Sequence, residues 1–356
     1  MLRTEQKIKN LLRIAAQRGA SDLHLVVGRY PTYRIDGKLI SLNQDEIITP
    51  EVTREICDVV LNEEKKKQLE KEGQVDLSYN FEDKVRFRVN AFFQQGYTSM
   101  AFRLISKGIR TLEELGVPEI LYDFTKVSQG LFLMVGPVGH GKSTTLAAMI
   151  DDINHNQEKH ILTIEDPIEY VYEQDRSIIN QREVYQDTNS FQLALKGLFR
   201  EDANVVLIGE LRDLDTISAA MTAAETGHLI FGTLHTNDAP QTIDRIVDVF
   251  PAHQQNQVRA QLASVLLAVV SQRLIPRVDE GRSPAVEIMI KNHAVENLIR
   301  ENKSYQIGNV IETSSQEGMV TMDRSLADLV RRGLVSLEVA SAYARDTKNF
   351  ETLLRY

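Results

Sequence analysis

Tryptophan is absent from this 356-residue sequence, and cysteine occurs once, at Cys57. A single thiol excludes both an intramolecular disulfide and a cysteine-rich zinc site. Cys57 lies in a segment with helical features, so we expect it to be an ordinary small core side chain. The chain is long enough, and at 42% hydrophobic content apolar enough, to bury a sizeable core in about two domains.

Long hydrophobic runs are also missing. The longest candidate, LASVLLAVV (residues 262–270), is bounded by polar residues, and a membrane span needs about 20 apolar residues. We therefore expect a buried helix segment at 262–270. The N-terminus shows helical spacing of apolar residues and no signal-peptide core, which predicts a soluble, cytosolic protein.

Positive charge is in short supply, with 41 Lys and Arg against 50 Asp and Glu, a formal net charge of −9. A protein whose main partner is bulk nucleic acid needs a basic surface to meet the phosphates. This balance therefore argues against nucleic acid as the partner, although a local basic groove stays open. The sequence also contains no internal repeat and no low-complexity tract.

Residues 1–106 predict a small mixed α/β domain. A first helix should end near Gly19, and DLHLVV (residues 22–27) alternates like a strand. An Asp-Gly pair at 36–37 separates two extended runs, which indicates a hairpin. Thr49 and Pro50 supply the N-cap and first position of the next helix.

Two arginines of this domain stand out. In the segment 84–105, Val85, Phe87 and Val89 alternate with polar residues, so Arg88 lies on the strand face opposite the apolar side chains. A hairpin turning at residues 95–96 places Arg88 directly across from Arg103. Like charges in that position repel unless an anion or an acid lies over them. Two solvated arginines are the simpler interpretation.

After a polar linker at Ser106–Arg110, apolar strand-like runs alternate with helical stretches as far as residue 250. This pattern predicts a parallel sheet covered by helices in a domain spanning 107–356. The remainder, from Ala252 to Tyr356, is predicted to be helical, with one short extended piece at PAVEIMI (residues 284–290).

A glycine loop follows the apolar run LFLMV. Gly136, Gly141, Lys142 and Ser143 fit the spacing G-x-x-x-x-G-K-[ST] between a strand and a helix. Glycines let several backbone N–H groups point at a phosphate chain, and the helix N-terminus adds positive potential. Lysine reaches the β- and γ-phosphates, and the serine hydroxyl ligates Mg²⁺. We predict an ATP site formed by the whole loop: Gly136, Pro137, Val138, Gly139, His140, Gly141, Lys142, Ser143 and Thr144.

Acidic residues end two later strands. Glu165 and Asp166 close ILTIED, and Glu210 follows NVVLIG. Ligands of open α/β sheets bind at the carboxyl ends of the strands. Two carboxylates there can hold metal-bound water and orient the attacking one, so Glu165 and Glu210 are candidate catalytic residues, and Glu210 with Ser143 a candidate Mg²⁺ site, in part through water.

Two histidines flank the strand LIFGTL. His235 follows it, so the carboxyl end of the strand places the ring at the same crevice. There the ring could donate a hydrogen bond to a γ-phosphate. His228 precedes it and is less easily explained by chemistry. A lone histidine is more often structural than functional.

Taken together, ASDLHL (residues 20–25), the glycine loop, ILTIEDPIEY, LIGELRD, AAETGHLIFGTLHT and TIDRIVDVFP resemble the type II/type IV secretion ATPase superfamily. Within it the chain looks most like the type IV pilus retraction ATPases, the PilT twitching-motility group. AVENLIRE (residues 294–301) is similar to that group's AIRNLIRE element, with Glu296 in place of arginine. His140 stands where serine or threonine is commoner.

The resemblance implies an N-terminal PAS-like domain, 1–106, and a C-terminal RecA-like ATPase domain, 107–356, in a homohexameric ring. It implies ATP and Mg²⁺ as cofactors, Arg88 and Arg103 as arginines supplied to the nucleotide, and His228 and His235 as the family's histidine box. It further implies a cytoplasmic motor, peripheral to the membrane, that meets an inner-membrane platform protein at the base of the pilus and powers pilus retraction and twitching.

Other functions remain open on the sequence. Pilus-extension and type II secretion ATPases of the superfamily are usually longer and commonly carry a four-cysteine zinc site, which one cysteine excludes. An accessory retraction paralogue, a nucleotide-sensing scaffold that hardly turns over, and a DNA translocase are further alternatives. The acidic charge balance disfavours the last of these.

Overall fold

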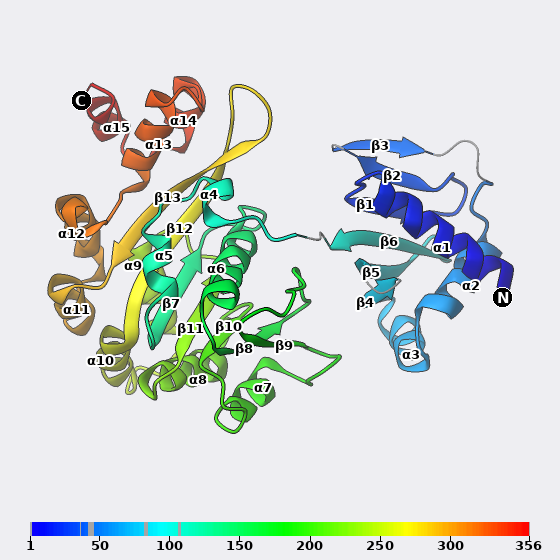
Figure 1. Ribbon diagram of the computed structural model, residues 1–356, viewed down its shortest axis with the longest axis horizontal. Helices are drawn as coiled ribbons and strands as arrows, with labels where there is room; N and C mark the ends of the chain where they lie inside the picture. Colours follow the sequence, from blue (N-terminus) through cyan, green and yellow to red (C-terminus); the bar gives the residue numbers. More distant parts are fainter. Residues whose placement is uncertain (1, 36, 42–45, 82–84, 106–107, 356) are drawn as a thin grey trace. The chain divides into compact units, whose positions relative to one another are not determined.

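The computed structural model describes residues 2–35, 37–41, 46–81, 85–105 and 108–355. The chain divides into two compact units, one built mainly from residues 1–108 and the other from residues 109–356. Each has its own sheet and its own core (Figure 1). The predicted domain boundary at 106/107 and the first two residues of the predicted linker lie outside the described residues.

The first unit is an antiparallel sheet with helices against one face. Its strands follow the order β3-β2-β1-β6-β5-β4. Apolar side chains of the strands and of the three helices form one core cluster. The elements are α1 (Leu2–Gln17), β1 (Asp22–Leu25), β2 (Thr32–Ile35), β3 (Lys38–Ser41), α2 (Pro50–Val60), α3 (Glu63–Glu72), β4 (Gln74–Phe81), β5 (Val85–Gln94) and β6 (Tyr97–Ile105).

Local signals in this unit act as predicted. The Thr49 side chain accepts a hydrogen bond from the backbone N–H of Val52, and Pro50 opens α2. The hairpin β2–β3 forms, although Asp36 of its turn lies outside the described residues. Cys57 is a buried core residue, as predicted, and burial raises the pKa of its thiol to about 12, which leaves it unreactive.

The second unit contains a seven-stranded sheet in the order β13-β12-β7-β11-β10-β8-β9. Neighbours from β12 to β9 run parallel, and β13 alone among the described strands of this sheet runs antiparallel, against β12. The strands are β7 (Gly130–Val135), β8 (His160–Glu165), β9 (Ile178–Glu183), β10 (Val205–Ile208), β11 (Leu229–Leu234), β12 (Leu266–Pro276) and β13 (Arg282–Ile290).

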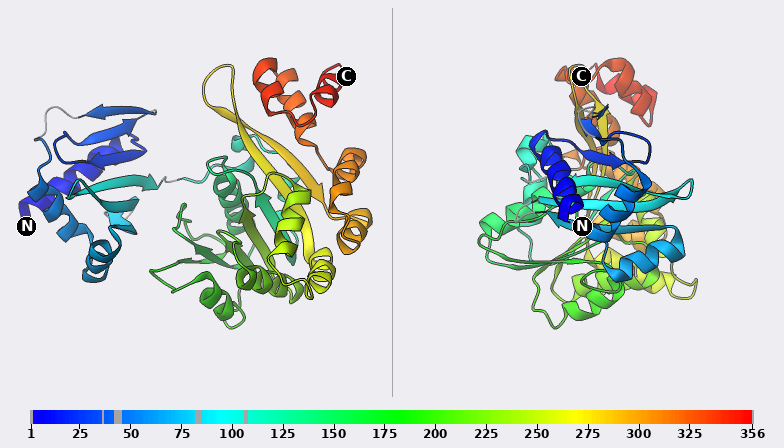
Figure 2. Two further views of the ribbon diagram at one scale, coloured as in Figure 1. Left: turned by 180° about the vertical axis from the view of Figure 1, so that it is seen from behind. Right: turned by 90° about the vertical axis from the view of Figure 1, so that its right-hand side faces the viewer.

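Helices cover both faces of this sheet (Figure 2). Alternate residues of the parallel strands pack into one cluster with α7 to α12. On the other face, Phe132 of β7 contacts Phe124 of α5, with ring centroids 5.2 Å apart. The helices are α4 (Leu112–Leu115), α5 (Leu121–Thr125), α6 (Lys142–Asn156), α7 (Phe191–Leu198), α8 (Leu214–Glu225), α9 (Ala239–Asp248), α10 (Gln255–Val265), α11 (His293–Arg300), α12 (Ile307–Thr313), α13 (Met322–Arg331), α14 (Leu337–Tyr343) and α15 (Thr347–Leu353), with short 3₁₀ turns at Ser304–Gln306 and Ser315–Glu317.

The prediction that residues 252–356 are helical apart from 284–290 is wrong over β12. The run 262–270 was expected to be a helix segment, but α10 ends at Val265 and β12 begins at Leu266. A short apolar run is compatible with a buried strand and with a buried helix. Here residues from Leu266 onward form a strand, because they pair with β7 and β13. The extended piece at 284–290 is confirmed as most of β13, and β9 was not predicted.

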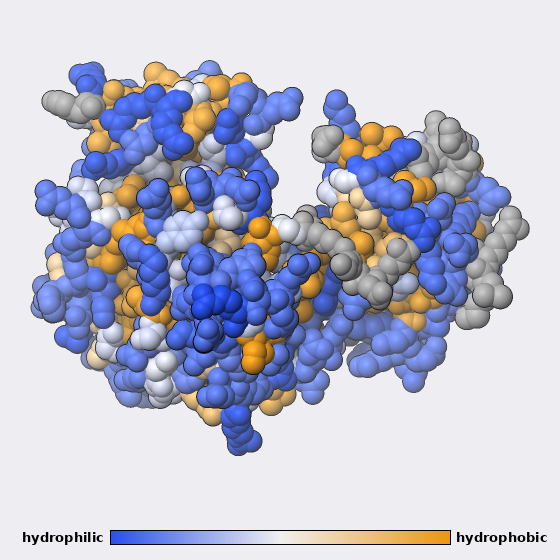
Figure 3. Space-filling view, in the orientation of Figure 1, coloured by the Kyte–Doolittle hydropathy of each residue, from blue (hydrophilic) through white to orange (hydrophobic). Residues whose placement is uncertain are grey.

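No helix within the described ranges is both long and apolar enough to span a membrane. Hydrophilic side chains cover most of the face seen in Figure 3, with smaller apolar areas between them. Scattered apolar exposure of this kind is normal at protein surfaces.

Candidate functional site

Four strands of the second unit deliver the candidate residues to one edge of the sheet. β7 runs into the glycine loop, β11 into His235, and β10 into Gly209 and Glu210, while Glu165 is the last residue of β8. These strands are parallel neighbours in the order β7-β11-β10-β8. Their carboxyl ends therefore bring together segments that are up to about a hundred residues apart in the sequence, as expected for open α/β sheets.

The glycine loop depends on backbone conformations that side chains disfavour. Gly136, Gly139 and Gly141 have φ values of 136°, 78° and 80°. A Cβ atom on Gly136 would lie 2.4 Å from the backbone oxygen of Gln272. Gly141 is the N-cap of α6 and Lys142 its first residue. Pro137, Val138, His140, Ser143 and Thr144 lie in the same loop or in the first turn of α6.

The ammonium group of Lys142 is buried inside this loop. Its Nζ donates to the backbone oxygens of Gly136 and Pro137, at 2.7 and 2.9 Å, and lies 3.3 Å from Nδ1 of His235. Phosphate oxygens form stronger, charge-assisted hydrogen bonds with an ammonium group than neutral carbonyls do. The loop therefore holds a cation where a bound phosphate would meet it.

Glu210 lies between His235 and Arg212 and contacts both. Its Oε1 lies 3.2 Å from Nε2 of His235, and its Oε2 lies 2.6 Å from Nη2 of Arg212. Burial alone would raise the pKa of Glu210, but the hydrogen bond from Arg212 and the charges of His235 and Arg212 together lower it. Glu210 is thus a charged carboxylate at neutral pH, in contact with His235, whose other ring nitrogen faces Lys142.

Glu165 is buried and held by polar neighbours. The hydroxyl of Thr163 donates to its Oε1 at 2.7 Å, and Nε2 of Gln181 lies 3.5 Å from the same oxygen. Gly209 brings the two acidic segments close, because a Cβ atom on it would lie 3.3 Å from Cα of Glu165. The structure thus gathers Lys142, His235, Glu210 and Glu165 on neighbouring strand ends.

His228 is not brought to this edge. It precedes β11, whose residues Leu229 and Leu234 pair with Gly130 and Val135 of β7. A six-residue strand spans about 20 Å, so His228 lies at the far end of β11 from the glycine loop. Its Nδ1 contacts the backbone oxygen of Ala223 at 3.0 Å. The geometry of a single chain therefore gives no support to His228 as a nucleotide contact.

Arg88 and Arg103 lie in the first unit with the predicted register, paired directly across β5 and β6. The structure supplies acids for both. Nε of Arg103 donates to Oδ1 of the buried Asp22 at 2.9 Å, and Nε of Arg88 lies 3.8 Å from Oδ1 of Asp76. Both arginine side chains remain substantially exposed, at 68% and 41%. The repulsion between them is therefore reduced within the sheet itself.

Sequence reasoning missed the contribution of β12. Gln272 accepts a hydrogen bond from the hydroxyl of Thr145 and donates one to the backbone oxygen of His140, both at 2.9 Å. Nδ1 of His140 accepts the backbone N–H of Leu274 at 3.0 Å. Burial, followed by the charges of Arg273, Arg282 and Lys142, lowers the pKa of His140 and keeps this nitrogen able to accept. The prediction of helices over residues 252–356 outside 284–290 missed β12, and therefore missed these contacts.

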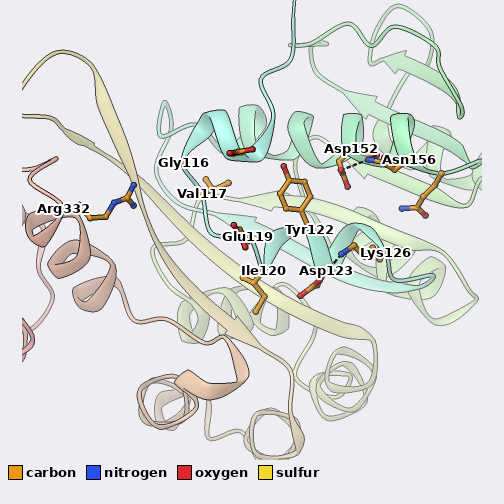
Figure 4. A pocket seen from close by; sticks show the side chains of 12 residues that line it. Gly116, Val117, Glu119, Ile120, Tyr122, Asp123, Lys126, Asp152, Asn156 and Arg332 are labelled. Atoms are coloured by element: carbon orange, nitrogen blue, oxygen red, sulfur yellow. Dashed lines mark hydrogen bonds and ion pairs between the residues drawn. The ribbon is translucent and has the colours of Figure 1, made fainter. Parts of the chain in front are cut away.

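A hollow of about 950 Å³ lies elsewhere on the second unit, beside α4 and α5 (Figure 4). Tyr122, Asp123 and Lys126 of this region lie along it, with Asp152 near the C-terminal end of α6. The glycine loop meets the opposite end of the same helix. None of the predicted site residues lines this hollow. It is therefore distinct from the sheet edge that carries the glycine loop, His235, Glu210 and Glu165, which we call the candidate phosphate-binding edge.

A glycine loop between a parallel strand and a helix N-terminus, with lysine, histidine and carboxylates beside it, defines an α/β protein of the nucleotide-binding class. A family model described as "Type II/IV secretion system protein" matches residues 3–309. The chain belongs to this family, which confirms the resemblance seen in the sequence.

Individual relatives agree. The chain is 47% identical over 343 residues to "Type IV pilus retractation ATPase PilT" of Pseudomonas aeruginosa, covering 96% of this chain and 99% of the relative. "Type IV pilus ATPase PilU" of the same organism is 37% identical over 350 residues, covering 98% and 91%. The crystal structure titled "Crystal Structure of the Pilus Retraction Motor PilT and Bound ADP" matches with a TM-score of 0.90 and 45% identity, covering 97% and 99%. The predicted fold class, a RecA-like α/β ATPase domain with a smaller N-terminal α+β domain, is confirmed by this match.

Proposed function

We propose that this chain is a Mg²⁺-dependent ATPase that works as a hexameric motor and powers retraction of a type IV pilus. The observation that carries the proposal is the contact chain from Lys142 through His235 to Glu210 at the end of a glycine loop. Similarity over nearly the full length to a PilT retraction ATPase supports the choice of process.

Each site residue has a chemical role in this proposal. The backbone N–H groups of residues 136–144 and the ammonium of Lys142 bind the phosphates. Glu165, held by Thr163, orients the attacking water and accepts its proton. His235 hydrogen-bonds the γ-phosphate and, through Glu210, reports its presence or loss. Arg88 and Arg103 neutralise charge that develops in the transition state, a role that can be worth about 10³–10⁵ in turnover.

The residues present fit Mg²⁺. Glu210 is a charged carboxylate because Arg212 and His235 lower its pKa, and the Ser143 hydroxyl lies in the first turn of α6. Magnesium is usually held by one or two side chains together with phosphate oxygens and waters. Ser143 and Glu210, the latter in part through water, would hold the ion, which when bound neutralises phosphate charge.

The motor itself would be a ring of six copies in the cytoplasm, peripheral to the inner membrane at the pilus base. Release of the γ-phosphate would reorient domains and pull on an inner-membrane platform protein. Arg88 and Arg103 of the first unit keep exposed side chains, at 41% and 68%, although each has an acid nearby, and this exposure supports a role toward a bound anion.

Glu210→Gln tests the catalytic part of the proposal. The variant keeps the shape of the side chain and removes the charge that Arg212 and His235 face. We expect steady-state phosphate release to fall at least about a hundredfold, with ATP binding retained. Hydrolysis at the wild-type rate would refute the assignment. An inactive wild-type protein would instead favour a nucleotide-sensing scaffold.

A second candidate is an accessory retraction ATPase, favoured by the 37% identity to PilU over 98% of the chain. Scoring pili and twitching in a deletion strain separates the alternatives. Excess pili without twitching indicates the main retraction motor, and absence of pili indicates extension. Normal pilus number with weakened twitching indicates an accessory role. Salt-dependent DNA binding by the purified protein would instead support the alternative that the chain is a DNA translocase.

A further inference from the structure

The loop that carries His235 into the site is fixed from behind. It joins β11 to α9, and its Asn237 backbone oxygen accepts two hydrogen bonds at 2.7 Å, from the Ser271 hydroxyl and from Nη2 of Arg345. Asp238 caps α9 by accepting the N–H of Gln241 at 2.8 Å. The position of His235 is therefore set by the contacts of Asn237 and Asp238, two and three residues further along the chain.

Arg345 reaches this loop from the C-terminal helices. It lies between α14 and α15, more than a hundred residues from His235 in the sequence. The buried carboxylate of Asp323, on α13, accepts the backbone N–H groups of Arg345 and Asp346 at 2.7 and 3.0 Å. The backbone that carries the guanidinium is thus held by α13 before the side chain extends to the loop.

Glu287 on β13 completes the contact. Its Oε2 lies 2.6 Å from Nη1 of Arg345, and its Oε1 accepts the N–H of Ala239 at 3.1 Å. Nη1 of Arg345 also lies 3.7 Å from Oδ2 of Asp238. Planar guanidinium groups suit such a forked arrangement, in which one cation binds a carbonyl and two carboxylates in fixed directions. A lysine could not reproduce it.

We propose that Arg345, paired with Glu287, is a positioning residue for ATP hydrolysis that holds the loop 235–238 so that His235 reaches Lys142 and Glu210. The inference rests on the proposed ATPase function and adds a residue that no motif in the sequence indicated. Through the same side chain, α13 to α15 are connected to the candidate phosphate-binding edge. Displacing a catalytic group by about 1 Å can lower the rate about a hundredfold.

Three variants separate positioning from simple stability. Arg345→Met removes the guanidinium and keeps an apolar side chain, and Arg345→Lys keeps only the charge. Glu287→Gln/Arg345→Met removes both charges, so that no buried carboxylate is left unpaired. Arg331→Met is the matched control, because Arg331 lies on α13, ion-pairs with exposed Asp328, and contacts no residue of the loop 235–238 within the described part of the chain.

In the full-length protein we expect Arg345→Met to lower kcat for ATP by about tenfold to a hundredfold, with little change in KM, because the glycine loop is untouched. Arg345→Lys should recover only part of this loss, and Arg331→Met should retain wild-type kinetics. The double variant should regain stability to urea relative to Arg345→Met but keep the low kcat. Amide hydrogen exchange at residues 235–242 should speed up in Arg345→Met and stay unchanged in Arg331→Met.

Recovery of kcat together with stability in the double variant would overturn the inference, because it would reduce Arg345 to a structural role. Wild-type kcat in Arg345→Met would overturn it as well and leave the ATPase proposal intact. A wild-type chain that does not hydrolyse ATP would refute the proposed function and the catalytic part of this inference. Unchanged exchange at 235–242 in Arg345→Met would refute the structural part.

Discussion

Replacing Glu287 by glutamine should change how the stability of this protein depends on pH. Burial of the carboxylate raises its pKa to about 6, even though Arg345 and the N–H of Ala239 stabilise the charge. Asp238 and Asp323 face the same group and raise its pKa further. The folded state therefore binds a proton at Glu287 more tightly than the unfolded chain does.

The magnitude follows from the two pKa values. The difference between about 6 in the folded protein and the ordinary 4.5 corresponds to about 2 kcal/mol of free energy of unfolding. Because the folded pKa is raised, this contribution is fully present below pH 4.5 and is lost as the pH rises through about 6. Glutamine does not titrate. The free energy of unfolding of wild type minus that of Glu287→Gln should therefore fall by about 2 kcal/mol between about pH 4 and about pH 7.5.

Urea unfolding followed by far-UV circular dichroism at several pH values measures this difference. Taking the difference between the two proteins removes the titration of all groups that they share. Glu338→Gln, at an exposed glutamate of α14, reports what the substitution itself does at a solvated position. A wild-type minus Glu287→Gln difference that stays constant across the range would refute the reasoning, since it would mean that burial does not perturb this carboxylate.

Other substitutions test the site directly. Gly136→Ala places a Cβ atom 2.4 Å from the Gln272 backbone oxygen at a φ of 136°. We expect the free energy of unfolding to fall by about 1–3 kcal/mol and ATP binding to be lost, both measured by thermal shift with and without ATP. His140→Ala removes an acceptor from a β12 N–H and should weaken ATP binding at neutral pH, measured by titration calorimetry. Because the pKa of His140 is lowered, the wild type should lose the same contact only as the pH falls below 6.5. Arg103→Ala should reduce kcat by about 10³ or more, whereas Arg34→Ala, which removes another arginine near Asp22, should leave it almost unchanged in the same phosphate-release assay.

Local signals predicted much of this molecule. The spacing of Gly136, Gly141 and Lys142 after an apolar strand identified the loop, because only glycine tolerates its backbone and close contacts. Acidic residues following apolar strands located Glu165 and Glu210, because parallel strands share one carboxyl edge. The register of Arg88 against Arg103 followed from counting residues on either side of a two-residue turn.

Contacts between distant segments could not be read in this way. The acid that meets Arg103 is Asp22, on a strand 81 residues earlier, and only the strand order β1-β6 brings them together. Gln272 supports the glycine loop because β12 pairs with β7, and the apolar run at residues 262–270 did not reveal that pairing. Nothing in the local sequence around Arg345 distinguishes it from a solvated arginine.

The same long-range contacts connect the C-terminal helices with the candidate phosphate-binding edge by two routes. One runs along β12 and β13, where Gln272 contacts the glycine loop and Ile275 packs in the core of α13 to α15. The other is the Glu287–Arg345 pair, which is costly to separate because an unpaired buried charge destabilises a protein by about 3–5 kcal/mol. Independent movement of α13 to α15 would have to break both routes at once. We therefore expect residues 109–356 to move as one rigid body during turnover. Spin labels on α8 and α13 should keep a single distance distribution with ADP and with a non-hydrolysable ATP analogue. A second distance that depends on the nucleotide would show that the C-terminal helices detach.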